Sequence, residues 1–122
     1  MLGVCRGLQA LNVLCGGMLE KDIQKASGET HVATTHEVEI MENGFIKGYA
    51  AGQKVNVNSF HREGVRSDTL APGLKMLAKT KGGVVEGFYH PDLPMAAVQW
   101  HPERNNPAAE LDKAIITSLF SR

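Results

Sequence analysis

Apolar and polar positions change their spacing twice near the start of the chain. Residues 2–5 form a short apolar run, which predicts a buried strand. Over residues 6–15 the apolar positions recur every three or four residues, which predicts a helix that the glycine pair at 16–17 ends. Residues 18–35 are polar and weakly periodic, so we expect a loop with one short helical turn. The residues predicted on the inward face of the helix are Leu8, Leu11 and Cys15.

The middle of the chain has the alternation that is typical of strands. Within residues 54–60, two valines face one side and two asparagines, Asn56 and Asn58, face the other. A short turn at Lys81-Gly82-Gly83 separates two of the strand-like segments, which predicts a β-hairpin. The predicted strands are residues 36–41, 54–60, 73–80, 84–90 and 95–101.

A second helix is predicted at the end of the chain, where Asn106 supplies an N-cap and Pro107 a first helical position. Its inward face would hold Ala108, Leu111, Ile115 and Leu119. The order strand, helix, several antiparallel strands, strand, helix predicts an α/β fold with a mixed sheet. With 122 residues, the chain is expected to form a single domain, residues 1–122.

Composition and charge exclude several classes of partner. Thirteen basic residues balance thirteen acidic ones, so the charge gives no reason to expect nucleic acid or an anionic membrane as a partner. No apolar run is long enough to span a bilayer, and no signal peptide is evident, so we expect a cytoplasmic location. Cys5 and Cys15 lack the spacing of a disulfide framework or zinc ribbon. The histidines at 31, 36 and 90 are scattered, so no metal is expected.

Cys5 lies between Gly3 and Gly7, where the predicted strand meets the predicted helix. This position is typical of a nucleophile on a sharp strand-to-helix turn. The helix dipole would lower the pKa of the thiol, and the backbone N–H of Arg6 would serve as an oxyanion donor. The alternative is a small buried cysteine with a structural role, and the two interpretations have about equal weight on this motif alone.

His101 supplies a candidate base for this nucleophile. It ends the apolar segment 95–101, and Glu103 follows two residues later. An imidazole can take the thiol proton and return it to a leaving amine, while a carboxylate fixes the tautomer of the ring. Taken singly, each residue is more simply a surface side chain; their common place at strand ends favours a catalytic arrangement.

These residues occur in motifs that resemble a known family. In order, GVCRGLQALNV, VNSFHREGV, APGLKMLAK, GGVVEGF and AAVQWHPE resemble the class I glutamine amidotransferase-like γ-glutamyl hydrolases, particularly the γ-glutamyl-γ-aminobutyrate hydrolase branch. The resemblance extends from residue 2 to the last helix. It implies a partial flavodoxin-like, class I glutamine amidotransferase-like fold that corresponds to the C-terminal half of the family domain and lacks the N-terminal half.

The resemblance also implies roles for individual residues. Cys5 matches the family nucleophile, His101 its base and acid, and Glu103 the residue that orients the histidine. Gln9 matches a glutamine that contacts the bound γ-glutamyl group of a small-molecule substrate, and no cofactor is implied. The loop that holds the amino-acid end of the substrate corresponds to Ser59, Phe60 and His61.

Two positions distinguish this chain within the resemblance. Arg6 belongs to a hydrolase-like CRG variant, which favours a free hydrolase over an ammonia donor. Glu63-Gly64 replaces the usual Gln-Ala after the histidine, which alters the expected rim of the substrate site.

Family members have about as much chain again before the nucleophile, and that half carries the second oxyanion donor. Two hypotheses therefore remain. The chain is a cysteine-dependent γ-glutamyl amide hydrolase, or it is a catalytically incomplete half-domain, either an associating subunit or an inactive fragment. In both cases the uncovered edge of the first strand predicts association, as a homo-oligomer or with a separately encoded N-terminal half.

Overall fold

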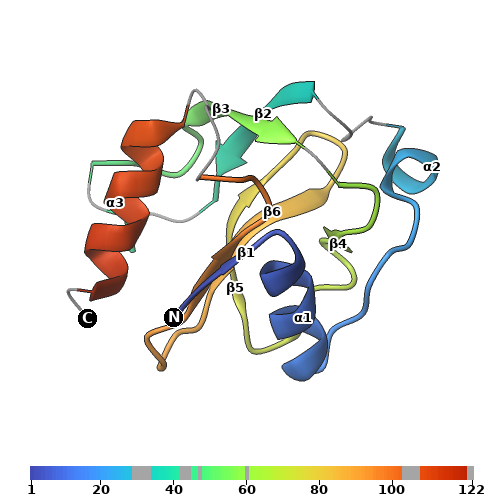
Figure 1. Cartoon of the computed structure of the whole chain (residues 1–122), viewed down its shortest axis with the longest axis horizontal. Coiled ribbons are helices and arrows are strands. Elements are labelled where there is room, and N and C mark those ends of the chain that lie inside the picture. Colours follow the sequence, from blue (N-terminus) through green and yellow to red (C-terminus); the bar gives the residue numbers. More distant parts are fainter. Residues whose placement is uncertain (29–33, 42–44, 47, 60, 103–107, 121–122) are drawn as a thin grey trace.

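The computed structural model describes residues 1–28, 34–41, 45–46, 48–59, 61–102 and 108–120 (Figure 1). In these residues the chain forms strands and helices in the order β1 (Leu2–Val4), α1 (Arg6–Leu14), α2 (Ile23–Ser27), β2 (Thr34–Ile40), β3 (Lys54–Ser59), β4 (Val65–Arg66), β5 (Lys75–Lys79), β6 (Val84–Tyr89), β7 (Ala96–Val98) and α3 (Ala109–Phe120). Each strand and helix predicted from the sequence has a counterpart here. The predicted N-cap Asn106 and the predicted first helical residue Pro107 lie outside the described residues.

One mixed sheet organises the fold. Its strand order is β1-β7-β6-β5-β2-β3, and β4 pairs with β6. β1 and β7 are parallel, whereas the other pairs are antiparallel. The predicted mixed sheet is therefore confirmed. The predicted hairpin is also confirmed, since β5 and β6 pair directly, with register shifts around Ala78.

The two longer helices cover opposite faces of the sheet (Figure 1). Because successive residues of a strand point to opposite faces, neighbours in β7 belong to different cores. Ala96 and Val98 pack in the cluster that contains α3, and Ala97 packs in the cluster that contains Leu8 of α1. The predicted inward face of α3 is confirmed, with Ala108, Leu111, Ile115 and Leu119 all buried.

The predicted inward face of α1 is only partly correct. Leu8 is fully buried and Leu11 is partly buried, but Cys15 is exposed and ends the helix as its C-cap. Asn12 is buried instead, and its side chain donates to the carbonyls of Met18 and Thr69 at 3.0 Å and accepts from the N–H of Ala71 at 2.7 Å. This face of α1 meets loop backbone, which an amide side chain satisfies and a thiol does not.

β1 forms one edge of the described sheet, where its only strand neighbour among the described residues is β7. Large apolar side chains nearby in sequence are exposed, including Leu14 at 81% and Met18 at 67%. None of the helices in the described part of the chain is long and apolar enough to cross a bilayer.

Candidate functional site

Cys5 occupies a strained turn between β1 and α1. Its φ of 53° is the only positive φ of a non-glycine residue in the part of the chain that the structure describes, and its ψ is −100°. Residues other than glycine rarely adopt this backbone conformation. Backbone strain of this kind is concentrated at functional sites. The N–H of Cys5 donates to the carbonyl of Val98 at 2.9 Å, which ties the turn to the end of β7. The predicted strand-to-helix turn is thus present.

The two flanking glycines have different roles. A Cβ at Gly3 would lie 2.9 Å from Cδ1 of Leu11 and 3.0 Å from the carbonyl carbon of Gly7, so Gly3 allows α1 to pack closely on β1. A Cβ at Gly7 would have no atom within 4 Å. The close approach of strand and helix therefore requires the first glycine, and no steric contact requires a glycine at the second position.

Two N–H groups stabilise a negative charge on the sulfur of Cys5. Nε2 of Gln99 donates to Sγ at 3.3 Å, and the backbone N–H of Arg6 also faces the thiol. Burial raises the pKa of the Cys5 thiol, and the hydrogen bonds from Arg6 and Gln99 oppose that rise only in part. The expected lowering of this pKa at the helix N-terminus is therefore wrong, because desolvation outweighs the nearby donors.

A cavity of about 260 Å³ opens beside the thiol. Its walls come from the β1–α1 turn with the start of α1, and from the loop that follows β3. Both signs of charge occur along this wall, because it includes arginine and glutamate side chains. The lining residues are Cys5, Arg6, Gln9, His61, Arg62 and Glu63.

Gln9 and His61 are held firmly in the wall of the cavity. Nε2 of Gln9 donates to the carbonyl of Glu63 at 2.9 Å and to Oε1 of Gln99 at 3.3 Å. The ring of His61 is 2% exposed, with Nδ1 2.8 Å from the carbonyl of Glu63 and Nε2 3.3 Å from Oε2 of the fully buried Glu86. The imidazole is thus placed between a loop carbonyl and a carboxylate of β6.

The other two residues of the predicted substrate loop are Ser59 and Phe60. Ser59 is fully buried at the end of β3 and does not line it. Phe60 lies outside the described residues. Of the predicted substrate-binding residues, the structure therefore brings Gln9 and His61 together with Cys5 and Arg6.

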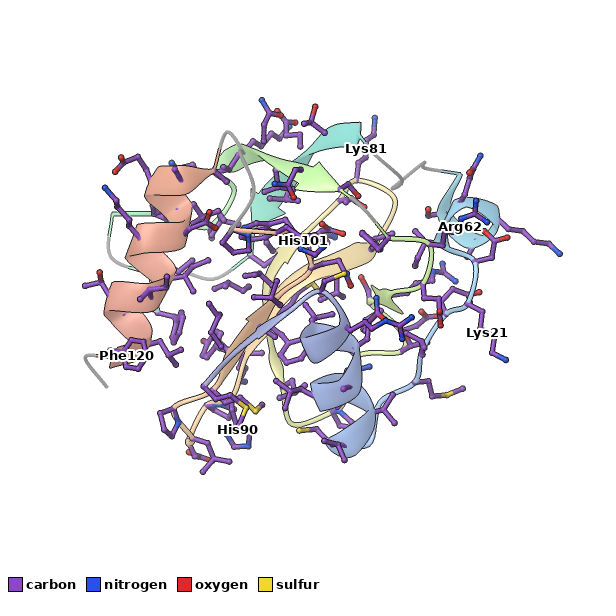
Figure 2. All side chains as sticks on the ribbon, viewed as in Figure 1. Lys21, Arg62, Lys81, His90, His101 and Phe120 are labelled. Atoms are coloured by element: carbon purple, nitrogen blue, oxygen red, sulfur yellow. The ribbon has the colours of Figure 1, made fainter. Side chains whose placement is uncertain are left out.

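His101 lies beyond the end of β7, near the start of α1 in the view of Figure 2. The parallel pairing of Val4 with Val98 places Cys5 beside Gln99, with His101 two residues further along. The backbone of His101 is fixed by Asn58, whose Oδ1 accepts from the His101 N–H at 2.9 Å and whose Nδ2 donates to the His101 carbonyl at 3.0 Å. His101 does not line the cavity, and Glu103 lies outside the described residues. The catalytic pairing of Cys5, His101 and Glu103 stays a prediction.

Sequence reasoning did not single out Gln99, Asn58 or Glu86. The sequence pattern around two of them indicates a buried polar side chain. Glu86 interrupts the apolar segment VVEGF, and Gln99 follows the apolar segment MAAV. A polar side chain inside a buried strand must find a partner, so such positions point to a site or a buried network. Asn58 was placed on the polar face of its strand, yet it is 3% exposed.

Comparison with known proteins shows the family of the chain. The sequence model of the Peptidase C26 family matches residues 1–103. The chain belongs to the peptidase C26 family. Relatives of the chain include the putative glutamine amidotransferase-like protein YvdE of Lactococcus lactis, 34% identical over 123 positions, which cover 94% of this chain and 50% of YvdE. The γ-glutamyl-γ-aminobutyrate hydrolase PuuD of Escherichia coli is 30% identical over 135 positions, covering 99% of this chain and 52% of PuuD.

Solved structures show the same fold. A putative GMP synthase component from Thermoplasma acidophilum superposes with a TM-score of 0.76 at 23% identity, covering 98% of this chain and 57% of that one. A glutamine amidotransferase from Thermotoga maritima superposes with a TM-score of 0.67 at 18% identity, covering 96% and 53%. The predicted class I glutamine amidotransferase-like fold is therefore confirmed. This peptidase C26 chain spans about half the length of the curated relatives it matches.

Proposed function

We propose that this chain carries the nucleophile-bearing half of a cysteine-dependent γ-glutamyl amide hydrolase. The observation that supports this most strongly is the strained turn at Cys5, which presents its thiol at a cavity walled by Gln9 and His61. A γ-glutamyl group carries an α-ammonium and an α-carboxylate. The arginine and glutamate side chains of the wall suit both charges.

The proposed reaction has two steps. His101 takes the proton of the Cys5 thiol, and the thiolate attacks the γ-amide carbon while the N–H of Arg6 stabilises the oxyanion. The C–N bond breaks as His101 gives that proton to the leaving amine. His101 then takes a proton from water, whose oxygen attacks the thioester carbon. The C–S bond breaks, free glutamate leaves and the thiolate is restored. Glu103 would hold the His101 ring in the required tautomer.

The descriptions of two relatives suggest which amine leaves in the first step. PuuD is described as a γ-glutamyl-γ-aminobutyrate hydrolase, and YvdE as glutamine amidotransferase-like. We propose an amine of the γ-aminobutyrate type as the leaving group, with release of ammonia from glutamine as the competing activity. No cofactor takes part in the proposed steps.

A second candidate function is that of an associating half-domain, as a homo-oligomer or with a separately encoded N-terminal half. The edge position of β1 and the exposed side chains of Leu14 and Met18 support it. In this case the partner would supply the second oxyanion donor, whose loss typically lowers turnover by about 100- to 1000-fold.

Hydrolysis of a chromogenic γ-glutamyl anilide tests both candidates. We would compare the wild type, Cys5→Ala and Cys15→Ser over a range of protein concentrations. The hydrolase hypothesis expects activity that Cys5→Ala abolishes and Cys15→Ser retains, since Cys15 is exposed and does not line the cavity. Activity that rises more steeply than protein concentration would indicate a site completed by association. Equal rates for the wild type and Cys5→Ala would reject the hydrolase for that substrate.

A further inference from the structure

We propose that Gln99 is a positioning residue that holds the Cys5 sulfur through an amide hydrogen bond, and that Gln9 fixes this amide from the wall of the cavity. The inference rests on the proposed function only in treating Cys5 as the nucleophile. Its test measures the reactivity of the thiol and requires no turnover.

The hydrogen-bond network fixes the orientation of both amides. The carbonyl of Glu63 can only accept, so the group of Gln9 that faces it at 2.9 Å must be the NH₂. The second hydrogen of that NH₂ then requires an acceptor, which Oε1 of Gln99 supplies at 3.3 Å. The NH₂ of Gln99 is therefore the group directed at Sγ of Cys5, at 3.3 Å. A flip of either amide would place two donors or two acceptors face to face.

The backbone holds Gln99 in the position that this network needs. The N–H of Gln99 donates to the carbonyl of Glu86 at 2.7 Å, and the carbonyl of the preceding Val98 accepts from the N–H of Cys5 at 2.9 Å. The side chain of Gln99 is also fully buried. The donor and the sulfur are therefore attached to two chain segments that are themselves hydrogen-bonded, which limits how far they can move apart.

A donor in this position has two consequences for the thiol. It stabilises the thiolate relative to the neutral thiol, and it restricts the direction in which the sulfur lone pairs point. Burial raises the pKa of the Cys5 thiol, and the hydrogen bond from Gln99 opposes that rise. Because Gln9 lines the cavity and also bonds to Gln99, a ligand that moves Gln9 changes the reactivity of the sulfur.

The rate of alkylation by iodoacetamide as a function of pH tests the proposal. All variants carry Cys15→Ser, so that alkylation reports on Cys5 alone. Gln99→Leu keeps the approximate volume and removes the donor, and we expect alkylation at about pH 7 to slow by about 3- to 10-fold, with the profile moved to higher pH. Gln9→Leu keeps the Gln99 amide as a donor but removes the hydrogen bond that holds it. We therefore expect alkylation to slow in this variant too, but by less than in Gln99→Leu.

Two further variants separate this role from a structural one. Gln99→Glu keeps the shape but directs a carboxylate oxygen at the sulfur, so we expect slower alkylation than in Gln99→Leu. Gln24→Leu makes the same chemical change at an exposed position of α2 and should leave the profile unchanged. The comparison is restricted to variants that retain the circular dichroism spectrum of the parent. The proposal would be overturned if Gln9→Leu and the Gln99 variants had the same alkylation profile as the parent. A failure of the hydrolase assay alone would leave these profiles as expected, so the two failures are distinguishable.

Discussion

The side-chain amide of Asn58 hydrogen-bonds both backbone groups of His101, accepting from its N–H at 2.9 Å and donating to its carbonyl at 3.0 Å. Asn58 is 3% exposed, so these bonds are largely shielded from water. The end of β3 therefore fixes the backbone that follows β7, on which the proposed base is carried. A side-chain amide carries both an acceptor and a donor, so it can satisfy an N–H and a carbonyl at once.

Replacing this amide should lower the stability of the folded chain. Asn58→Ala removes both hydrogen bonds to the backbone of His101, and we expect the free energy of unfolding in urea to fall by about 1–3 kcal/mol. Asn58→Asp is the matched control, because it keeps an acceptor for the N–H but replaces the donor to the carbonyl. At neutral pH we expect a loss at least as large as in Asn58→Ala, because a buried carboxylate oxygen then faces the His101 carbonyl. An Asn58→Ala protein as stable as the wild type would show that these bonds contribute no net stability.

The carboxylate of Glu86 should reduce the reactivity of the nucleophile. Its negative charge raises the pKa of the Cys5 thiol, in addition to the larger effect of burial. Glu86→Gln removes that charge and should lower this pKa, so iodoacetamide alkylation of Cys5 in the Cys15→Ser background should become faster near neutral pH. Glu37→Gln, at a side chain of β2 that is 58% exposed, is the control and should have no effect. Slower alkylation in Glu86→Gln would contradict the electrostatic argument.

The raised pKa of Cys5 also predicts how stability depends on pH. The ordinary value is 9.0, and burial raises it in the folded state, so the folded chain binds this proton more tightly than the unfolded chain does. The resulting stabilisation is complete below pH 9 and is lost as the pH rises through the folded pKa. We therefore expect urea unfolding to show a steeper loss of stability from about pH 8 to pH 10 in Cys15→Ser than in the Cys5→Ser, Cys15→Ser double variant. Parallel curves would contradict the prediction.

The two glycines around the nucleophile should respond in opposite ways to the same substitution. Gly3→Ala places a Cβ 2.9 Å from the Leu11 side chain and 3.0 Å from the backbone of Gly7, and overpacking of this kind typically costs about 1–3 kcal/mol. Gly7→Ala meets no atom within 4 Å and lies in α1, where alanine is favoured over glycine by about 0.5–1 kcal/mol. Thermal denaturation of the two variants would measure the difference. A Gly3→Ala protein that melts no lower than Gly7→Ala would contradict the packing argument.

Local periodicity was enough to predict most of the secondary structure. The inward face of α3 and the β5–β6 hairpin were predicted correctly, because each depends on residues close together in the chain. The inward face of α1 was predicted wrongly at Cys15. Which side of that helix is buried depends on the loop around Thr69 and Ala71, which lies more than fifty positions away and offers backbone groups that Asn12 satisfies.

The sequence by itself determined the turn that carries Cys5, the elements on either side of it and, through its motifs, the family. The tertiary structure decided what surrounds the sulfur. Gln99 and Cys5 are 94 positions apart, and Asn58 and His101 are 43 apart, so no local pattern relates them. Cys5 and Gln99 meet because the parallel register of β1 and β7 places the ends of these two strands together, and a register is set by the packing of the whole sheet. β3 lies at the other end of the strand order, and it reaches the chain that follows β7 through the side chain of Asn58. The burial of the Cys5 thiol also depends on the tertiary structure, and burial raises the pKa of the thiol. Its position at a helix N-terminus alone predicted a lowered pKa.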